Sequence, residues 1–181
     1  MEIIGKKQSI ENCTFNNATV YQFADGVPET LEVSIKKINK DIKLLNKLVS
    51  EKTEQCANAF LFSEFLKYRK DIETIITYGL QGVRDDLKQK IYYLKFMMDF
   101  QQGNNEGAND CLDNLESPFK EEINRLLEII NTKGTGYNLE GLLPESQAFV
   151  LDQLFAAREY EVILFWYDQR KLSENSLLEN C

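Results

Sequence analysis

The chain contains no histidine among its 181 residues. This absence excludes Ser-His-Asp and Cys-His catalysis and every metal site that needs an imidazole ligand. It also removes the side chain that most often acts as a general base near neutral pH. An enzyme built on this sequence would have to use carboxylates, lysine, tyrosine or cysteine.

Cysteine is scarce, and its four residues are widely separated: Cys13, Cys56, Cys111 and Cys181. No pair has the C-x-x-C spacing of a zinc site, and the set is too sparse for the disulfide framework of a small secreted domain. No apolar run approaches the roughly 18 residues of a membrane span, and no secretory signal follows Met1–Lys7. The sequence therefore predicts a cytoplasmic protein with reduced thiols, no metal, no cofactor and no membrane association.

What the chain does contain favours a folded globular domain. Apolar residues make up 43% and charged residues 28%, and the formal net charge is -8. These proportions argue against disorder. With 181 residues the chain is long enough for one domain with its own core and an appendage.

The first 27 residues differ in composition from the rest. Residues 1–27 are rich in β-branched, aromatic and Asn residues, which predicts a short β-hairpin or arm before the turn at Asp25–Pro28. Two short strands are only marginally stable alone. We therefore expect the arm to pair with another subunit or a second copy, or to lie on the helices as a lid. Its candidate contact residues are Phe15, Val20, Tyr21 and Phe23.

Residues 28–175 predict a mainly α-helical domain of antiparallel hairpins or a bundle, followed by a frayed tail at 176–181. Apolar residues at steps of three and four predict one helix along the stripe 31–49 and another along 61–75. The polar segment 50–55 is either a turn or part of one long bent helix. The same spacing predicts later helices at 83–101, at 106–115, after Pro118, and from Pro144 to Lys171.

Two segments resemble helix-turn-helix repeats of the tetratricopeptide kind. They span about 93–115 and 145–170, and each combines an aromatic or apolar helix, a polar turn and a second helix that opens on Glu. In that family such hairpins stack into a curved array that holds partner peptides or proteins. The alternative is a generic pair of α-helical hairpins.

A second resemblance concerns the stretch Ile10–Gly26. It is similar to the short Asn-rich β-motifs that begin some bacterial immune proteins associated with nucleotide-dependent oligomerisation. The resemblance implies an element for pairing or self-assembly and a place in bacterial anti-phage defence. The alternative is a hairpin that covers the helical core.

Two further surfaces are candidates for partner contact. Lys36, Lys40, Lys43 and Lys47 follow steps of four, three and four on the polar face of the first predicted helix. This stripe is either a solvated face or a contact for an acidic protein or a phosphate; without arginine or interleaved aromatics, it argues against direct nucleic-acid binding.

The other surface is the run of adjacent aromatic residues Phe165, Trp166 and Tyr167. Three neighbours cover about 200° of a helix, so this helix is either central to the core or exposes one edge to a partner.

These patterns predict a non-catalytic protein–protein interaction subunit or adaptor of a larger cytoplasmic complex. The alternative is an enzyme or nucleotide-binding subunit that works without histidine, through lysine, tyrosine or carboxylates.

Overall fold

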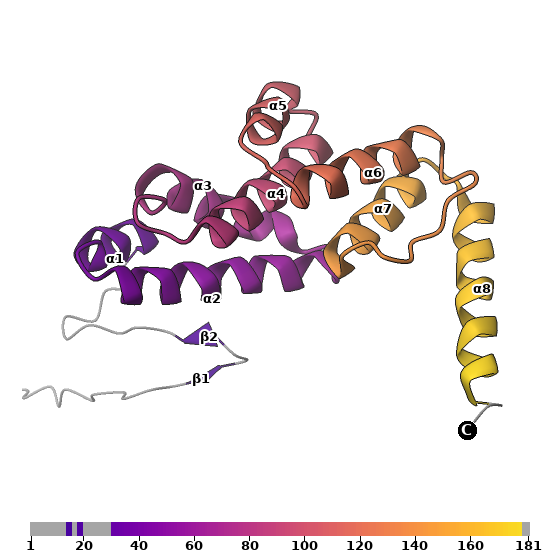
Figure 1. Ribbon diagram of the computed structural model, residues 1–181, viewed down its shortest axis with the longest axis horizontal. Helices are drawn as coiled ribbons and strands as arrows, with labels where there is room; N and C mark the ends of the chain where they lie inside the picture. Colours follow the sequence, from indigo (N-terminus) through magenta and orange to yellow (C-terminus); the bar gives the residue numbers. More distant parts are fainter. Residues whose placement is uncertain (1–13, 16–17, 20–29, 179–181) are drawn as a thin grey trace, which may run out of the picture.

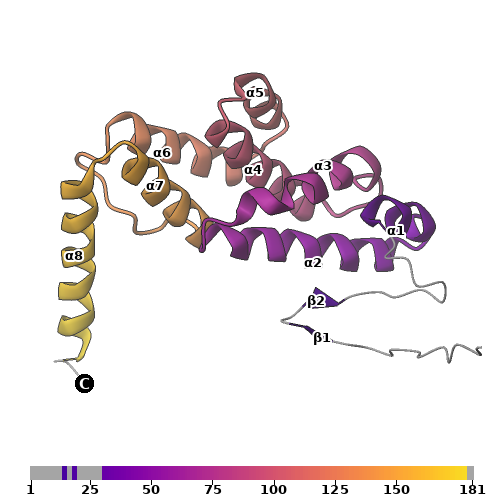
Figure 2. The ribbon, with the colours of Figure 1, turned by 180° about the vertical axis from the view of Figure 1, so that it is seen from behind.

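The computed structural model describes residues 14–15, 18–19 and 30–178, with side chains placed from 30 to 169. This part of the chain is mainly α-helical, as predicted, and elongated, with its first and last helices at opposite ends (Figures 1 and 2). None of the helices described is long and apolar enough to cross a membrane.

The helical elements follow one another with short connections. In chain order they are α1 (Leu31–Ile38), α2 (Ile42–Phe60), the 3-10 helix η1 (Phe65–Tyr68), α3 (Arg69–Tyr78), α4 (Asp85–Gln101), α5 (Asn105–Asp113), α6 (Phe119–Asn131), α7 (Pro144–Ala156) and α8 (Tyr160–Leu178).

Two short strands lie within the predicted arm. β1 (Thr14–Phe15) and β2 (Ala18–Thr19) pair antiparallel, with Thr14 opposite Thr19. The other candidate contact residues of the arm (Val20, Tyr21 and Phe23) lie outside the described residues, as do residues 179–181 of the predicted tail. The arm and its contacts therefore stay a prediction.

The first predicted helix is divided into two. α1 ends at Ile38, and Asp41 begins α2 as its N-cap, where its Oδ1 accepts hydrogen bonds from the backbone N–H groups of Lys43 and Leu44, both at 3.1 Å. An aspartate in this position satisfies amides that the helix itself leaves free and favours a helix start. Segment 50–55, predicted as a turn or a continuation, is helical, since α2 runs on to Phe60.

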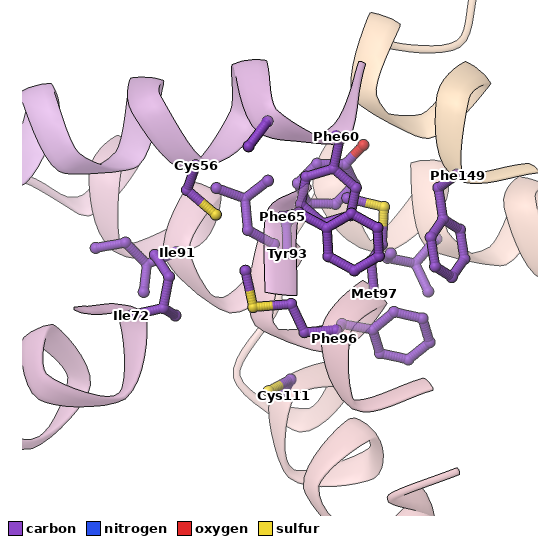
Figure 3. Packing of buried hydrophobic residues seen from close by; sticks show 14 of the residues in the cluster. Cys56, Phe60, Phe65, Ile72, Ile91, Tyr93, Phe96, Met97, Cys111 and Phe149 are labelled. Atoms are coloured by element: carbon purple, nitrogen blue, oxygen red, sulfur yellow. The ribbon is translucent and has the colours of Figure 1, made fainter. Parts of the chain in front are cut away.

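The core forms around α4, which contacts α2, α3, α5 and α6. Eight of the 17 residues of α4 are buried. Aromatic rings from distant parts of the chain meet next to it (Figure 3): Phe60 stacks on Phe65 with ring centroids 4.0 Å apart, and Phe149 of α7 approaches Phe60 edge-on at 6.4 Å. Such aromatic pairs bury large apolar surfaces and set the relative positions of their helices.

The two segments that resemble tetratricopeptide repeats behave differently. α4 and α5 form a closely packed hairpin whose turn contains Gly103 at φ +70° and the N-cap Asn104. α7 and α8 are also joined by a short turn, but α8 leaves the body, and its C-terminal half lies apart from the other helices described (Figures 1 and 2). The second hairpin is therefore open, and membership of that family stays a hypothesis.

Candidate functional site

One face of α8 is fixed to the loop between α6 and α7. Trp166 is only 7% exposed, and its indole Nε1 donates a hydrogen bond to the backbone carbonyl of Tyr137 at 2.7 Å. Gly134 in that loop has φ +73°, and a Cβ atom there would lie 2.7 Å from Cγ1 of Val162. Lys133, just before Gly134, forms an ion pair of 2.8 Å with Glu159, just before α8. The position of α8 therefore depends on its contacts with this loop.

Another side of α8, which borders this contact, has no covering element among the described residues. We call it the acidic α8 face; its members are spaced i, i+3, i+4, i+7 and are all exposed: Glu161, Leu164, Phe165 and Asp168. Leu164 is 62% and Phe165 58% exposed. Residues at this spacing share one side of a helix. The face therefore presents two large apolar side chains between two carboxylates.

The three adjacent aromatic residues Phe165, Trp166 and Tyr167 differ in their exposure to solvent. Phe165 and Tyr167 are exposed, Tyr167 to 63%, whereas Trp166 is buried against its own chain. α8 is accordingly not a central core helix. Trp166 positions the helix, and its two neighbours remain accessible to another molecule.

A groove of about 710 Å³ runs beside α8. Its lining combines the loop 134–138 with Arg125 of α6 and with Glu161, Val162, Phe165 and Trp166 of α8. Arg125 Nη2 donates to the carbonyl of Glu140 at 2.7 Å. A hydrogen bond to Glu128 raises the pKa of the Tyr137 hydroxyl, which therefore stays neutral and is a poor base or nucleophile.

The four candidate lysines lie at the other end of the body, on two elements and the turn between them. Lys36 belongs to α1, where it pairs with Glu32 at 2.5 Å and lies 4.6 Å from the ring centroid of Tyr78. Lys40 is in the turn, and Lys43 and Lys47 are on α2. All four are exposed, but they do not form one stripe, because the sequence spacing crosses a helix break at Asp41.

An ionic cluster in the interior was missed by the sequence reasoning. Asp99 of α4 is completely buried, and its Oδ1 accepts hydrogen bonds from Arg69 of α3 at 3.0 Å and from Asn104 at 3.1 Å. Lys95, one turn earlier, forms an ion pair with the same carboxylate. The only signal in the sequence is a charged residue inside an apolar run. The cluster joins α3, α4 and the start of α5.

A second polar contact fixes α7 on α4. Glu145 is 5% exposed and pairs with Lys90, and the buried hydroxyls of Tyr93 and Ser146 form a hydrogen bond. Both buried carboxylates, Asp99 and Glu145, thus have a cation as partner. Such pairing is what a buried charge needs for structural reasons alone.

The two described cysteines are buried, and their thiols are held in the protonated, weakly reactive form. Burial raises the pKa of the Cys56 thiol to about 12 and that of Cys111 to about 11. The thiolate is the nucleophilic form, so neither group is activated at neutral pH.

We expect Cys56 and Cys111 to resist alkylation by iodoacetamide in the folded protein at mildly alkaline pH and to react readily in denaturant. Mass spectrometry of the labelled peptides measures both rates. Rapid labelling of Cys56 in the folded state would instead indicate an activated thiol and would favour an enzyme.

No group of three or more Cys, Asp or Glu side chains in the described part of the chain is arranged to hold a metal ion. Comparisons with protein-family models, with curated proteins and with solved structures found no match to this chain. Function is therefore inferred from the exposed and buried groups described above.

Proposed function

We propose that this protein is a non-catalytic interaction subunit or adaptor of a larger cytoplasmic complex, with α8 as a contact surface. The observation that carries the proposal is the exposure of Leu164 and Phe165 on one side of a helix that Trp166 fixes to the body; Tyr167 is also exposed, further round the helix. Large apolar side chains gathered on a surface are characteristic of protein–protein contacts. Aromatic residues in particular supply much of the binding energy of such interfaces.

The attachment of α8 supports this role because it positions the surface in advance. Trp166 and Gly134 hold the first half of the helix at a defined angle to α7. A partner that binds such a surface does not have to order it, and the conformational entropy lost on binding is correspondingly smaller.

The charges of the described part give no support to the alternative of an enzyme without histidine. The two buried carboxylates are neutralised by cations, and the buried thiols are held in their neutral form. A role in bacterial defence rests on the resemblance of Ile10–Gly26, most of which lies outside the described residues. Pairing through the N-terminal arm would add a second contact to the one on α8.

The proposal is tested by a photo-crosslinking amino acid placed at position 164 in cells that express the chain. We expect a covalent adduct with a partner, reduced roughly tenfold or more when Phe165 and Tyr167 are both replaced by serine. Because these two residues are exposed, the thermal melting of the serine variant should stay close to that of the unmodified chain.

The matched control carries the crosslinker at Asp113, an exposed position on α5. Adducts that depend on position 164 and on the two aromatic residues support the proposal. The same adducts from both positions, or none from position 164, would refute it.

A further inference from the structure

The charges of this chain are separated along its length. Residues 30–101, which form α1 to α4, contain 13 Lys and Arg against 10 Asp and Glu, whereas residues 102–178, which end with α8, contain 6 against 14. α1 and α8 lie at opposite ends of the body (Figure 1). The part of the chain that begins with α1 and α2 is therefore net positive, and the part that ends with α8 is net negative, although α8 itself also contains Arg170 and Lys171.

The net positive part carries a counterpart of the acidic α8 face. We call it the basic α2 face; its exposed members are Lys43, Leu44 and Lys47 on the first turns of α2 and Lys40 in the turn before the helix. Leu44 is 40% exposed, and Ile42 beside it is 57% exposed. Each face thus combines apolar and charged side chains, with charges of opposite sign.

Most charges on the two faces have no partner among the side chains that the structure places. Within the part of the chain that the structure describes, the side chains of Lys40, Lys43, Glu161 and Asp168 make no ion pair or hydrogen bond. Lys47 has only a distant contact, 3.9 Å from Glu51. Exposed and unpaired charges of opposite sign attract over about 10 Å at moderate salt and orient two approaching surfaces.

The basic α2 face also borders a groove. Its volume is about 520 Å³, and its lining includes Ile42, three cations (Lys43, Lys47 and Arg84) and two carboxylates (Glu51 and Glu54). Arg84 pairs with Asp86 at 2.9 Å and Lys47 lies 3.9 Å from Glu51, so Lys43 is the groove cation with no partner among the described side chains. An apolar side chain of an incoming helix can contact Ile42 there, while its flanking carboxylates meet the lysines.

We propose that the acidic α8 face of one copy docks on the basic α2 face of a second copy. This inference rests on the proposed function, since it names a second copy as an occupant of the same α8 surface. Because the two faces lie at opposite ends of the molecule, the contact is head-to-tail and leaves one free face at each end of the pair. Repeated addition then builds a filament, or a ring if the rotation between copies closes.

The test is sedimentation velocity of the full chain over a range of protein and salt concentrations. We expect oligomers at low salt that dissociate as salt screens the charges. Two variants then reverse the charges of one face each: Glu161→Lys with Asp168→Lys, and Lys40→Glu with Lys43→Glu. Each variant alone should associate roughly tenfold more weakly or worse, because its two ends carry like charges.

An equimolar mixture of the two variants should associate again. In the mixture the reversed α8 face of one variant meets the reversed α2 face of the other, and the native faces also remain complementary. Asp113→Lys and Lys120→Glu, which change exposed and unpaired charges on α5 and α6, serve as controls and should leave association unchanged. Circular dichroism verifies that every variant is folded.

Three results would overturn the inference: a chain that stays monomeric at every concentration and salt, association that survives both reversals, or a mixture that fails to associate when each variant alone is monomeric. A monomeric chain that still crosslinks from position 164 to a different protein would leave the proposed function standing. A monomeric chain with no such crosslink would refute both.

Discussion

Replacing Asp99 with alanine is expected to lower the free energy of unfolding by about 3–5 kcal/mol. The carboxylate is fully buried and accepts hydrogen bonds from Arg69 and Asn104 while pairing with Lys95. Its removal leaves two partly buried cations without their counter-charge and takes away the contact that joins α3 to α4 and to the start of α5. A loss of this size is a large part of the stability of a typical domain.

Chemical denaturation followed by circular dichroism measures this change. Asp113→Ala on α5 is the matched control, since Asp113 is exposed and unpaired, and it should change stability by less than about 0.5 kcal/mol. Asp99→Asn keeps the shape of the side chain and one oxygen acceptor, so we expect an intermediate loss. A variant Asp99→Ala as stable as the control would mean that the cluster contributes nothing to the fold.

Replacing Gly134 with alanine is expected to release α8 from the body. The new Cβ would lie 2.7 Å from Cγ1 of Val162 and 2.9 Å from Cη2 of Trp166, and the backbone has φ +73°. The left-handed backbone costs a non-glycine residue about 1–2 kcal/mol, and overpacking adds about 1–3 kcal/mol. Together these terms are large enough to open a contact that involves one face of one helix.

Trp166 reports this opening directly because it is the only tryptophan of the chain. We expect its fluorescence emission to shift to longer wavelength in Gly134→Ala, and amide hydrogen exchange in the first half of α8 to become faster. Gly136→Ala is the control: Gly136 has φ +79°, but a Cβ there would have no neighbour within 4 Å. Equal fluorescence shifts in the two variants would show that backbone strain, and not contact with α8, sets the role of Gly134.

The release of α8 also bears on association. Gly134→Ala should weaken crosslinking from position 164 and head-to-tail assembly together, since both depend on the orientation of the acidic α8 face. The substitution changes no residue of either face, so its effect reports on the positioning of the helix.

Local patterns in the sequence were sufficient for the helical class and for the hairpin at Gly103. Apolar residues at helical spacing report that a helix has one buried side, whatever it packs against. Turn residues such as Gly103 and Asn104 act through their own backbone and side-chain geometry, so they can be recognised without a partner. The exclusion of histidine-dependent chemistry needs no structure at all.

The break at Asp41 was not predicted, because the apolar spacing continues across it. Ile38 and Ile42 keep the helical step of four, yet Asp41 caps a new helix and Ile42 is 57% exposed. Periodicity alone does not distinguish one helix from two that share the same pattern. The side-chain hydrogen bonds of a single aspartate decide between them, and with them whether the lysines form one stripe.

The sequence by itself determined that this is a mainly helical chain without histidine chemistry and with separated charges. Only the tertiary structure decided which aromatic residues of α8 are accessible and which acidic residues are buried. Phe165, Trp166 and Tyr167 are adjacent and have no periodicity that could rank them; the distinction comes from Gly134 and the carbonyl of Tyr137, about 30 residues away in the sequence. Asp99 is likewise buried because a cation from α3 reaches it, and such a long-range pairing leaves no local pattern.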